Sequence, residues 1–375
     1  MAISGVIRSY DNNAVTNRED LANVISMISP TETPFLTMLN RGPKAVNTKH
    51  EWGEDALRGM TDTLAAAAST ACSNLIIHNA ATRVPCSTNY PVLVRIDEEY
   101  ILATSRTTNY INTFTRGYNS TTTAAHSSSA SVEIIGDLDP EGSAARTALA
   151  QTKSRAYNYT QVFRDTISVS GTQQAIIEAG IVGSESDYQI AQKYKELAIK
   201  VERALISGTR AVNTSSSNFR SMGGLWSFIS TNKTNASSAA ITEANIMDDA
   251  KSCYDAGGRP SILMCNSTQM QKIINLYTSR VRTSVEAIFG GLEITKIACP
   301  WTADGTLSLI LNPWVPQHEY YVVDMAKCAL IPLREFAAVP LAHTGDSDNF
   351  EVIGEYTLEV KNETAHARRY GLSTS

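Results

Sequence analysis

The chain has 375 residues, of which 43% are hydrophobic, so it is long enough to bury the cores of two or three domains. Its 32 Lys and Arg residues against 37 Asp and Glu residues give a formal net charge of -5, which excludes a global attraction to nucleic acid or to an anionic membrane. The first residues lack the apolar core of a signal peptide, and no uncharged apolar stretch is long enough to span a membrane. We therefore expect a protein that is made and kept in a cytoplasm.

The sequence carries none of the short motifs that mark a common catalytic site. It has no P-loop, no glycine-rich dinucleotide turn, no paired-histidine zinc motif and no nucleophile elbow. The acidic run Asp97, Glu98 and Glu99 is expected to form a solvated turn or strand edge rather than a catalytic pair, because neighbouring strand residues point to opposite faces. The six cysteines form no CxxC pair and are expected as free, mostly buried thiols, and the six scattered histidines are expected at the surface or at an interface. The sequence therefore predicts no catalytic, cofactor-binding or metal-ligating residue.

Residues 1–50 have the pattern of an arm rather than of a domain. Asn17 is placed to cap a helix that Pro30 ends. A single amphipathic helix has no core of its own, so we expect it to lie on another surface. Its apolar stripe consists of Leu21, Val24, Ile25 and Ile28.

The amino-acid composition and the hydrophobic pattern change within the stretch from 61 to 136. Residues 61–82 carry one formal charge and are mainly Ala, Ser and Thr, which predicts an extended loop that packs along a neighbour. Residues 83–136 contain short strand-like runs with a turn signal every eight to twelve residues, the pattern of a small β-barrel or sandwich. We interpret 83–136 as a module inserted into a long loop.

The clearest elements follow this module. Residues 157–170 alternate as a strand, and residues 185–207 form the longest amphipathic helix, which Gly208 ends. From Thr242 on, helices and strands alternate, with a helix that Thr242 starts, a strand at 261–265, a helix capped by Asn266 and three more strands. This pattern predicts a compact α/β unit.

The C-terminal segment requires a choice between helix and strand. Glu351, Glu355 and Glu359 recur every four residues, and a helix would stack these like charges. A strand instead places apolar residues on one face and the glutamates toward solvent or a neighbouring subunit. We therefore predict a strand, followed by a basic pair, Arg368 and Arg369, that could belong to a solvated face or a subunit ion pair, with phosphate contact as the less favoured alternative.

Seven segments occur in the order known from a family of tailed-phage capsid proteins. They are "ISPTETPFLTMLNRG", "HEWGEDALRG", "TFTRGYNSTTTAAHSSSASVEIIG", "PEGS", "NYTQVFRDTISVSGT", "KYKELAIKVERALISG" and "GEYTLEVKNETAH". The match spans nearly the whole chain, from about residue 20 to 372, and the sequence resembles the major capsid proteins with the Hong Kong 97 fold. The resemblance implies an α+β protein that self-assembles as pentamers and hexamers into an icosahedral shell around packaged double-stranded DNA.

The resemblance also implies a division of the chain and its contacts. An N-terminal arm would span 1–50 and an extended loop 51–155, with the β-module at about 83–136. A peripheral domain would comprise 156–238, with a spine helix at 185–207, and the return strands 331–375, and an axial domain would span 239–330. The side chains expected where copies meet are Pro34, Phe35, Leu36, Met38, Leu39, Trp52, Glu355, Glu359, Arg368 and Arg369.

Two features of this sequence differ from properties known in the family. The founding member of the fold crosslinks its subunits through a Lys and an Asn assisted by a Glu, and no motif here identifies such a trio, so we expect a shell without crosslinks. The N-terminus lacks a long charged helix that would act as a fused scaffold, so a separate scaffolding protein is expected, with a portal and a possible decoration protein as further partners. The location implied is the virion capsid, assembled in the host bacterial cytoplasm.

Two other classes of function remain as alternatives. A fibre or decoration protein with an adhesive β-module would not need the long helix and the α/β unit. A hydrolase using Asp97 or Glu98 would need these carboxylates to converge with a nucleophilic or basic partner in a pocket.

Overall fold

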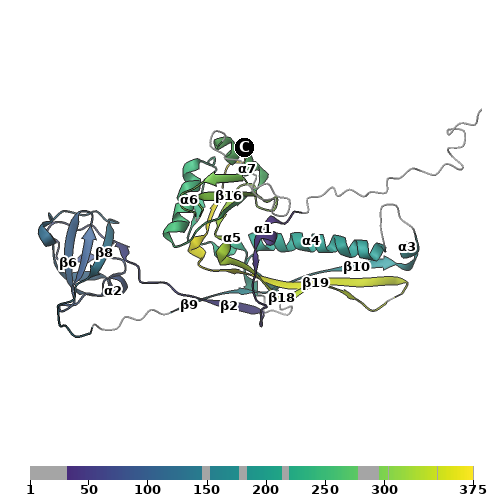
Figure 1. Ribbon diagram of the computed structural model, residues 1–375, viewed down its shortest axis with the longest axis horizontal. Coiled ribbons are helices and arrows are strands. Elements are labelled where there is room, and N and C mark those ends of the chain that lie inside the picture. Colours follow the sequence, from purple (N-terminus) through teal and green to yellow (C-terminus); the bar gives the residue numbers. More distant parts are fainter. Residues whose placement is uncertain are drawn as a thin grey trace, which may run out of the picture. The chain divides into compact units, whose positions relative to one another are not determined.

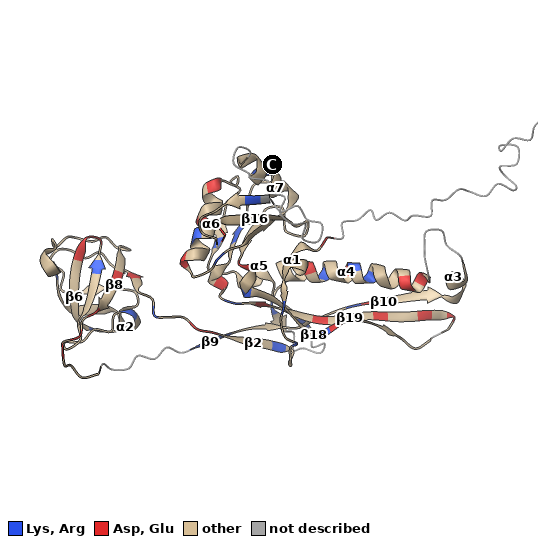
Figure 2. Ribbon diagram, in the orientation of Figure 1, with Lys and Arg blue, Asp and Glu red and all other residues tan. Residues whose placement is uncertain are grey.

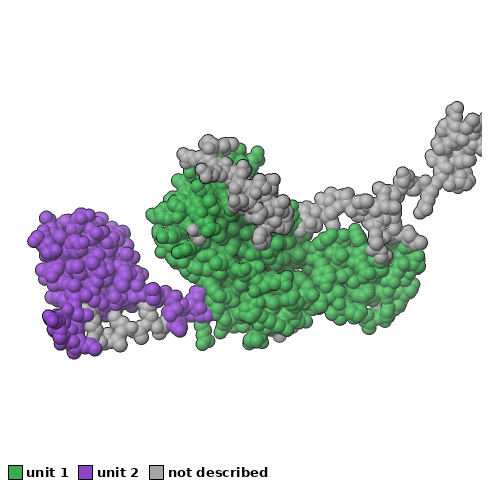
Figure 3. Space-filling view, in the orientation of Figure 1, with its two compact units in different colours: residues 1–52, 155–375 green, residues 53–154 purple. Residues whose placement is uncertain are grey.

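The computed structural model describes residues 32–145, 153–176, 184–212, 219–277, 295–302, 304–343 and 345–374. The chain divides into two compact units, one made of Met1–Trp52 with Arg155–Ser375 and the other of Gly53–Ser154 (Figures 1 and 3). The helix expected at 18–29, after the cap Asn17, lies outside the described residues. Each unit has a core of its own, so each is built from its own sequence patterns.

The first sheet of the larger unit carries the spine helix. Its strand order is β1-β18-β19-β10, and α4 lies along it (Figure 1). β10 pairs with β19 over ten residues without a register shift, so the alternation of both strands stays in phase. The bounds are β1 (Asn40–Arg41), β10 (Gln161–Ser170), β18 (Cys328–Pro340), β19 (Ser347–Val360) and α4 (Glu185–Ser207).

The helix α4 has the ends that the sequence predicts. The Ser184 side chain accepts a hydrogen bond from the Asp187 N–H at the N-terminus. At the other end stands Gly208, where a Cβ would clash with the carbonyl oxygens of Ala204 and Met222. The predicted helix at 185–207 and the strand at the C-terminal end are both confirmed.

The second sheet of the larger unit belongs to the α/β segment. Its order is β13-β20-β17-β14-β16-β15, with α6 and α7 packed on one face. On β14, Leu263 lies in the core beneath these helices, whereas Met264 lies in the core shared with α4, as the period of two requires. The bounds are β13 (Lys233–Asn235), β14 (Ile262–Cys265), β15 (Thr295–Ala298), β16 (Thr306–Leu311), β17 (Tyr320–Val323), β20 (Ala367–Tyr370), α6 (Glu243–Asp255) and α7 (Ser267–Leu276).

Shorter elements connect these layers. The Thr242 side chain caps α6 as predicted, but the Asn266 side chain, expected to cap α7, instead donates to the carbonyl oxygens of Pro313 and Val315. The connecting elements are α1 (Pro34–Met38), β2 (Lys49–Glu54), β9 (Ser154–Tyr159), α3 (Gly171–Ala175), β11 (Ala211–Val212), β12 (Arg220–Ser221), α5 (Leu225–Phe228), η3 (Met325–Lys327) and η4 (Glu363–Ala365).

A buried glutamate of the spine helix holds α1. Both oxygens of Glu202 accept backbone hydrogen bonds, from the Phe35 N–H at 2.9 Å and the Leu36 N–H at 2.7 Å. The amide of Asn312 donates to the same carboxylate at 2.6 Å. Burial raises the pKa of Glu202, and these three hydrogen bonds oppose that rise in part. The segment after residue 32 is thereby fixed to its own chain.

The smaller unit is a closed β-barrel. Its six strands run in the order β3-β8-β5-β6-β7-β4, and the outer strands are joined by hydrogen bonds from the Ala65 N–H to the Ile76 carbonyl and from the His78 N–H to the Thr63 carbonyl. Where β3 meets β4, neither strand has an open edge, so another chain cannot add a strand there. The bounds are β3 (Thr61–Thr63), β4 (Leu75–Ile76), β5 (Val92–Ile96), β6 (Glu99–Arg106), β7 (Tyr110–Thr115), β8 (Ser131–Asp137), α2 (Ala80–Arg83) and η2 (Tyr118–Ser120).

The barrel corrects the expectation for residues 61–82. That segment supplies two strands and a helical turn, and Leu64, Leu75 and Ile77 are at most 1% exposed in the barrel core. The small residues between them are compatible with close packing inside one chain as well as with an extended loop, which is why composition was misleading. The module therefore begins near residue 61 rather than near 83.

A buried carboxylate organises the loop above β6. Glu99 is 1% exposed and accepts hydrogen bonds from Arg116 at 2.9 and 2.6 Å, from the Gly117 and Ala124 N–H groups, and pairs with His126 at 2.9 Å. Burial alone would raise the pKa of Glu99, but these hydrogen bonds outweigh it and lower the pKa to about 2. The barrel thus contains a satisfied charge cluster at the end of its sheet.

This cluster corrects two predictions. Asp97 and Glu98 are exposed in a turn as expected, whereas Glu99 begins the next strand and points inward. His126 is 3% exposed and its other ring nitrogen lies 2.7 Å from Asp97, so this histidine is not a surface residue. The same holds for His366, which is fully buried, and burial lowers its pKa to about 4.

Replacing Phe35 by Ala tests the attachment of α1. Because the ring is fully buried in the core of the larger unit, Phe35→Ala is expected to lower the free energy of unfolding by about 3–5 kcal/mol, measured by urea denaturation. Val46→Ala, at a side chain that is 99% exposed in the same segment, is the control and should change it by less than about 0.5 kcal/mol. A Phe35→Ala chain of unchanged stability would contradict this packing.

Acid titration tests the Glu99 cluster. Since the pKa of Glu99 falls from about 4.3 in an unfolded chain to about 2, its contribution to stability is present above about pH 4 and is lost as the pH falls toward 2. Melting temperatures measured by circular dichroism should therefore drop over this window in the wild type. The Glu99→Gln chain should have a lower melting temperature than the wild type at neutral pH, and this temperature should fall less on acidification. The control is Glu133→Gln, in a partly exposed pair with Arg95, whose melting temperatures should follow those of the wild type. Equal acid slopes for all three chains would rule out the proposed role.

Candidate assembly surfaces

The apolar residues expected at contacts between copies lie largely inside their own chain. Phe35 is fully buried, Leu39 is 6% exposed and Trp52 is 7% exposed. Pro34 is also buried, and Leu36 and Met38 are partly buried against the same core as α4. Residues 34–39 thus have a partner surface on α4 and its Glu202, and Trp52 has one against His50 and Phe228. That these residues also meet other copies stays a prediction.

The two glutamates of β19 are also paired within the chain. Glu355 is 4% exposed and accepts hydrogen bonds from the Thr160 hydroxyl at 2.6 Å and from Arg220 at 2.8 Å. Glu359 is 7% exposed and pairs with His50 at 2.7 Å and with Lys361 at 2.9 Å. The strand prediction was right, but both carboxylates bind side chains of their own chain and do not face solvent.

The basic pair near the C-terminus has a structural role. Arg368 is 3% exposed and binds Glu319 through two hydrogen bonds, of 3.0 and 2.6 Å. Arg369 lies on the opposite face of β20 and binds Asp249 through two hydrogen bonds, of 2.9 and 2.8 Å. Because buried arginines held by two hydrogen bonds to a carboxylate cannot reach a phosphate, neither residue is a DNA contact.

Exposed apolar side chains are the surfaces that remain for contacts. Val46 is 99% exposed and Leu57 is 97% exposed, in segments on either side of β2. Burying one such side chain contributes about 1.5–3 kcal/mol. Sequence reasoning missed both, since each stands alone in a polar stretch without periodicity. Other large apolar residues at least 40% exposed are Met60, Ile76, Ile135, Val162, Ile176, Phe219, Trp226, Tyr254, Leu276 and Val339.

One face of β10 is also exposed. Every second residue of β10 from Val162 to Ser170 is exposed, on the side away from α4. Along this face Arg164 lies opposite Ile353 in the register and forms an ion pair with Glu351 at 3.7 Å. Figure 2 shows the acidic residues of β19 along the same sheet. The face mixes aliphatic and charged side chains, as a surface that meets another protein commonly does.

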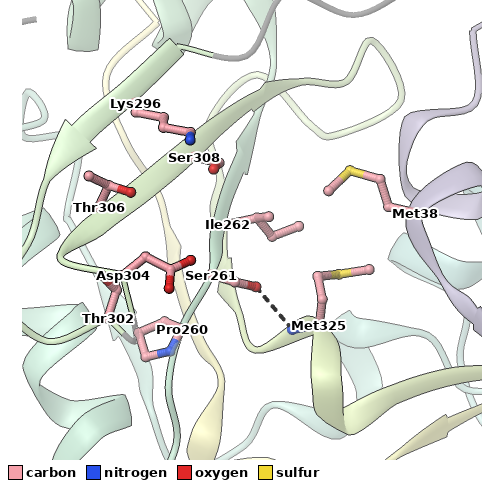
Figure 4. A pocket seen from close by; sticks show the side chains of 10 residues that line it. All are labelled: Met38, Pro260, Ser261, Ile262, Lys296, Thr302, Asp304, Thr306, Ser308 and Met325. Carbon is pink, nitrogen blue, oxygen red and sulfur yellow. Dashed lines mark hydrogen bonds between the residues drawn. The ribbon is translucent and has the colours of Figure 1, made fainter. Parts of the chain in front are cut away.

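A cavity of about 290 Å³ lies where α1, β14 and β16 meet (Figure 4). Met38, Ile262 and Met325 form its apolar wall, and the Ser261 hydroxyl accepts a hydrogen bond from the Met325 N–H. Its described lining includes neither histidine nor cysteine. The Ser261 hydroxyl is thus engaged by the backbone of η3.

Among the described residues, no group of three or more His, Cys, Asp or Glu side chains is arranged so that it could hold a metal ion. No helix of these residues combines the length and the apolar composition needed to cross a membrane.

The comparisons with known proteins agree with this architecture. The model of the family described as SU10 major capsid protein matches residues 8–373. No curated protein sequence matches the chain significantly.

Solved structures of low sequence identity share the fold. The SrpI encapsulin complex of Synechococcus elongatus PCC 7942 has a TM-score of 0.51 at 9% identity, over 99% of this chain and 97% of that chain. A structure from Mycobacterium phage Bobi has a TM-score of 0.50 at 11% identity, and the capsid of phage XM1 has 0.50 at 10%, each over 99% of this chain and 100% of that chain. These likenesses show the fold alone, which is the Hong Kong 97 capsid fold.

The family match spans nearly the whole chain and includes both units. A capsid protein needs contacts between copies and no reaction centre, which agrees with exposed apolar surfaces and charge clusters that are satisfied internally. The chain therefore belongs to the SU10 major capsid protein family and is a structural protein of the capsid shell rather than an enzyme.

Proposed function

We propose that the chain assembles as pentamers and hexamers into a closed icosahedral head that encloses the double-stranded DNA of a tailed phage. The match of the capsid family over residues 8–373 is the observation that carries this proposal. A closed shell built from many copies of one chain needs symmetric rings, and rings of five supply the curvature that rings of six alone lack.

The parts of the chain then have distinct roles. The arm, residues 1–50, and the loop with its barrel, residues 51–155, extend the contacts of each copy to its neighbours. The peripheral domain, 156–238 with 331–375, forms the body of the shell around α4. The axial domain, 239–330, meets its copies at the centres of the rings.

The packaged DNA is held by enclosure rather than by specific recognition. The chain has a formal net charge of -5, and the buried arginines of β20 are committed to carboxylates. A DNA-binding surface would instead need clustered cations on one accessible face. We expect contacts with DNA at the inner face to be few and independent of sequence.

Further partners follow from the same role. Shell assembly in the host bacterial cytoplasm is proposed to use a separate scaffolding protein, and the shell would carry a portal through which DNA enters. A decoration protein is a possible addition to the outer face. None of these partners requires a catalytic group on this chain.

Assembly should depend on an exposed apolar residue. Leu57→Asp is expected to leave the circular dichroism spectrum and melting temperature unchanged, because the side chain is 97% exposed in the single chain. If copies bury Leu57, a buried charge at this position weakens every contact between copies in which the residue takes part. Electron microscopy should then show at least about tenfold fewer closed shells.

The control for this experiment is Thr70→Asp, at an exposed turn of the same unit. It introduces the same charge without removing an apolar side chain, so shells should form as in the wild type. Fibres or discrete trimers from the wild-type chain would overturn the proposed head. Normal shells from Leu57→Asp would show only that Leu57 lies outside the contacts.

The shell is expected to contain no covalent links between copies. Purified particles, boiled in denaturant, should give a single gel band at the 40.7 kDa of one chain. A ladder of multimers that persists under reducing conditions would contradict this expectation.

A further inference from the structure

A second cavity lies at the C-terminal end of the spine helix. It has a volume of about 650 Å³ and is bounded by the last turn of α4 and the loop that follows β16. We call it the Trp314 groove and define it by Arg203, Ala204, Ser207, Trp314, Val315 and Pro316. Its wall is apolar where Ala204 faces the loop, with Arg203 lying over the Trp314 ring at 6.0 Å.

The N-terminal part of the chain joins the fold at this groove. The indole N–H of Trp314 donates a hydrogen bond of 2.8 Å to the Glu32 carbonyl, at the first described residue. Two residues later α1 begins and is held by Glu202 on the same helix. The 31 residues before Glu32 therefore start from the wall of the groove.

Those residues contain one apolar surface that needs a partner. The stripe of the predicted 18–29 helix ends at Ile28, and Pro30 lies between this helix and the anchored carbonyl of Glu32. Four residues of extended chain reach about 13–14 Å, so Ile28 is within reach of the groove. A cavity of this size has room for several aliphatic side chains.

We propose that the apolar stripe of residues 18–29 docks in the Trp314 groove of its own chain. The short tether makes docking intramolecular, and the effective concentration of a segment on a short flexible linker is in the millimolar range. A second copy in dilute solution cannot match that concentration. The groove thus covers the stripe before copies meet, which keeps an aggregation-prone surface out of water. This inference does not rest on the proposed head.

Thiol crosslinking of the full-length chain tests the proposal. Five of the six native cysteines are buried, so introduced cysteines can be addressed selectively, with each single variant as a background control. In Ile28→Cys with Ser207→Cys, a short bis-maleimide should join the two sites within one chain. The product is a band at monomer mass, with the linked peptides identified by mass spectrometry.

A second pair of introduced cysteines tests whether residue 28 lies in the groove rather than elsewhere on the chain. Thr166 is exposed on the face of β10 away from α4, so Ile28→Cys with Thr166→Cys should give roughly tenfold less intrachain product. Similar yields from the two pairs would overturn the proposal. Product found only as dimers would also overturn it, because the occupant would then be a second copy.

Variants within the segment test the apolar stripe itself. Ile25→Asp, added to the Ile28→Cys and Ser207→Cys pair, should lower the intrachain product roughly tenfold, because a charge opposes burial in the groove. Asn23→Asp, on the opposite side of the predicted helix, should leave it unchanged. An unchanged yield in Ile25→Asp would contradict docking through the stripe.

Discussion

The carboxylate of Glu202 is the interaction on which the larger unit depends. It is fully buried near the C-terminal end of α4 and receives hydrogen bonds from α1 and from Asn312, which follows β16. The residue before α1, Thr33, forms no side-chain cap, so Glu202 takes the place of the usual capping side chain. One ionisable group thus joins the arm, the spine helix and the axial sheet.

This arrangement has an energetic logic. A buried carboxylate is costly, and burial does raise the pKa of Glu202, but each of its oxygens meets donors supplied by other segments. Because the donors come from 110 to 167 residues away, they converge only when the whole unit is folded. The interaction therefore favours one arrangement of the arm over others that would bury the same apolar area.

The sequence could predict the elements but not their partners. Helix α4 and strands β5 to β8 are visible because apolar residues recur at a fixed period and turn residues separate them. The hydrogen bonds that join Glu355, Glu359, Arg368 and Arg369 to Arg220, His50, Glu319 and Asp249 span 49 to 309 positions, and no periodicity records such pairings. An alternating strand pattern shows which side chains share a face, whereas burial of that face depends on the rest of the fold.

The same reasoning explains why residues expected between copies have partners within their own chain. Aromatic and charged side chains were expected between copies because they stand out in the sequence, yet such side chains also stabilise the single chain. Phe35 fills a core and Arg368 pairs with Glu319, so moving either into a contact between copies would first break an internal interaction. Side chains without an internal role, such as Val46 and Leu57, can enter a contact at no such cost. A protein that must fold alone and then assemble can separate the two tasks in this way, with its charges satisfied inside and its apolar contacts left at the surface.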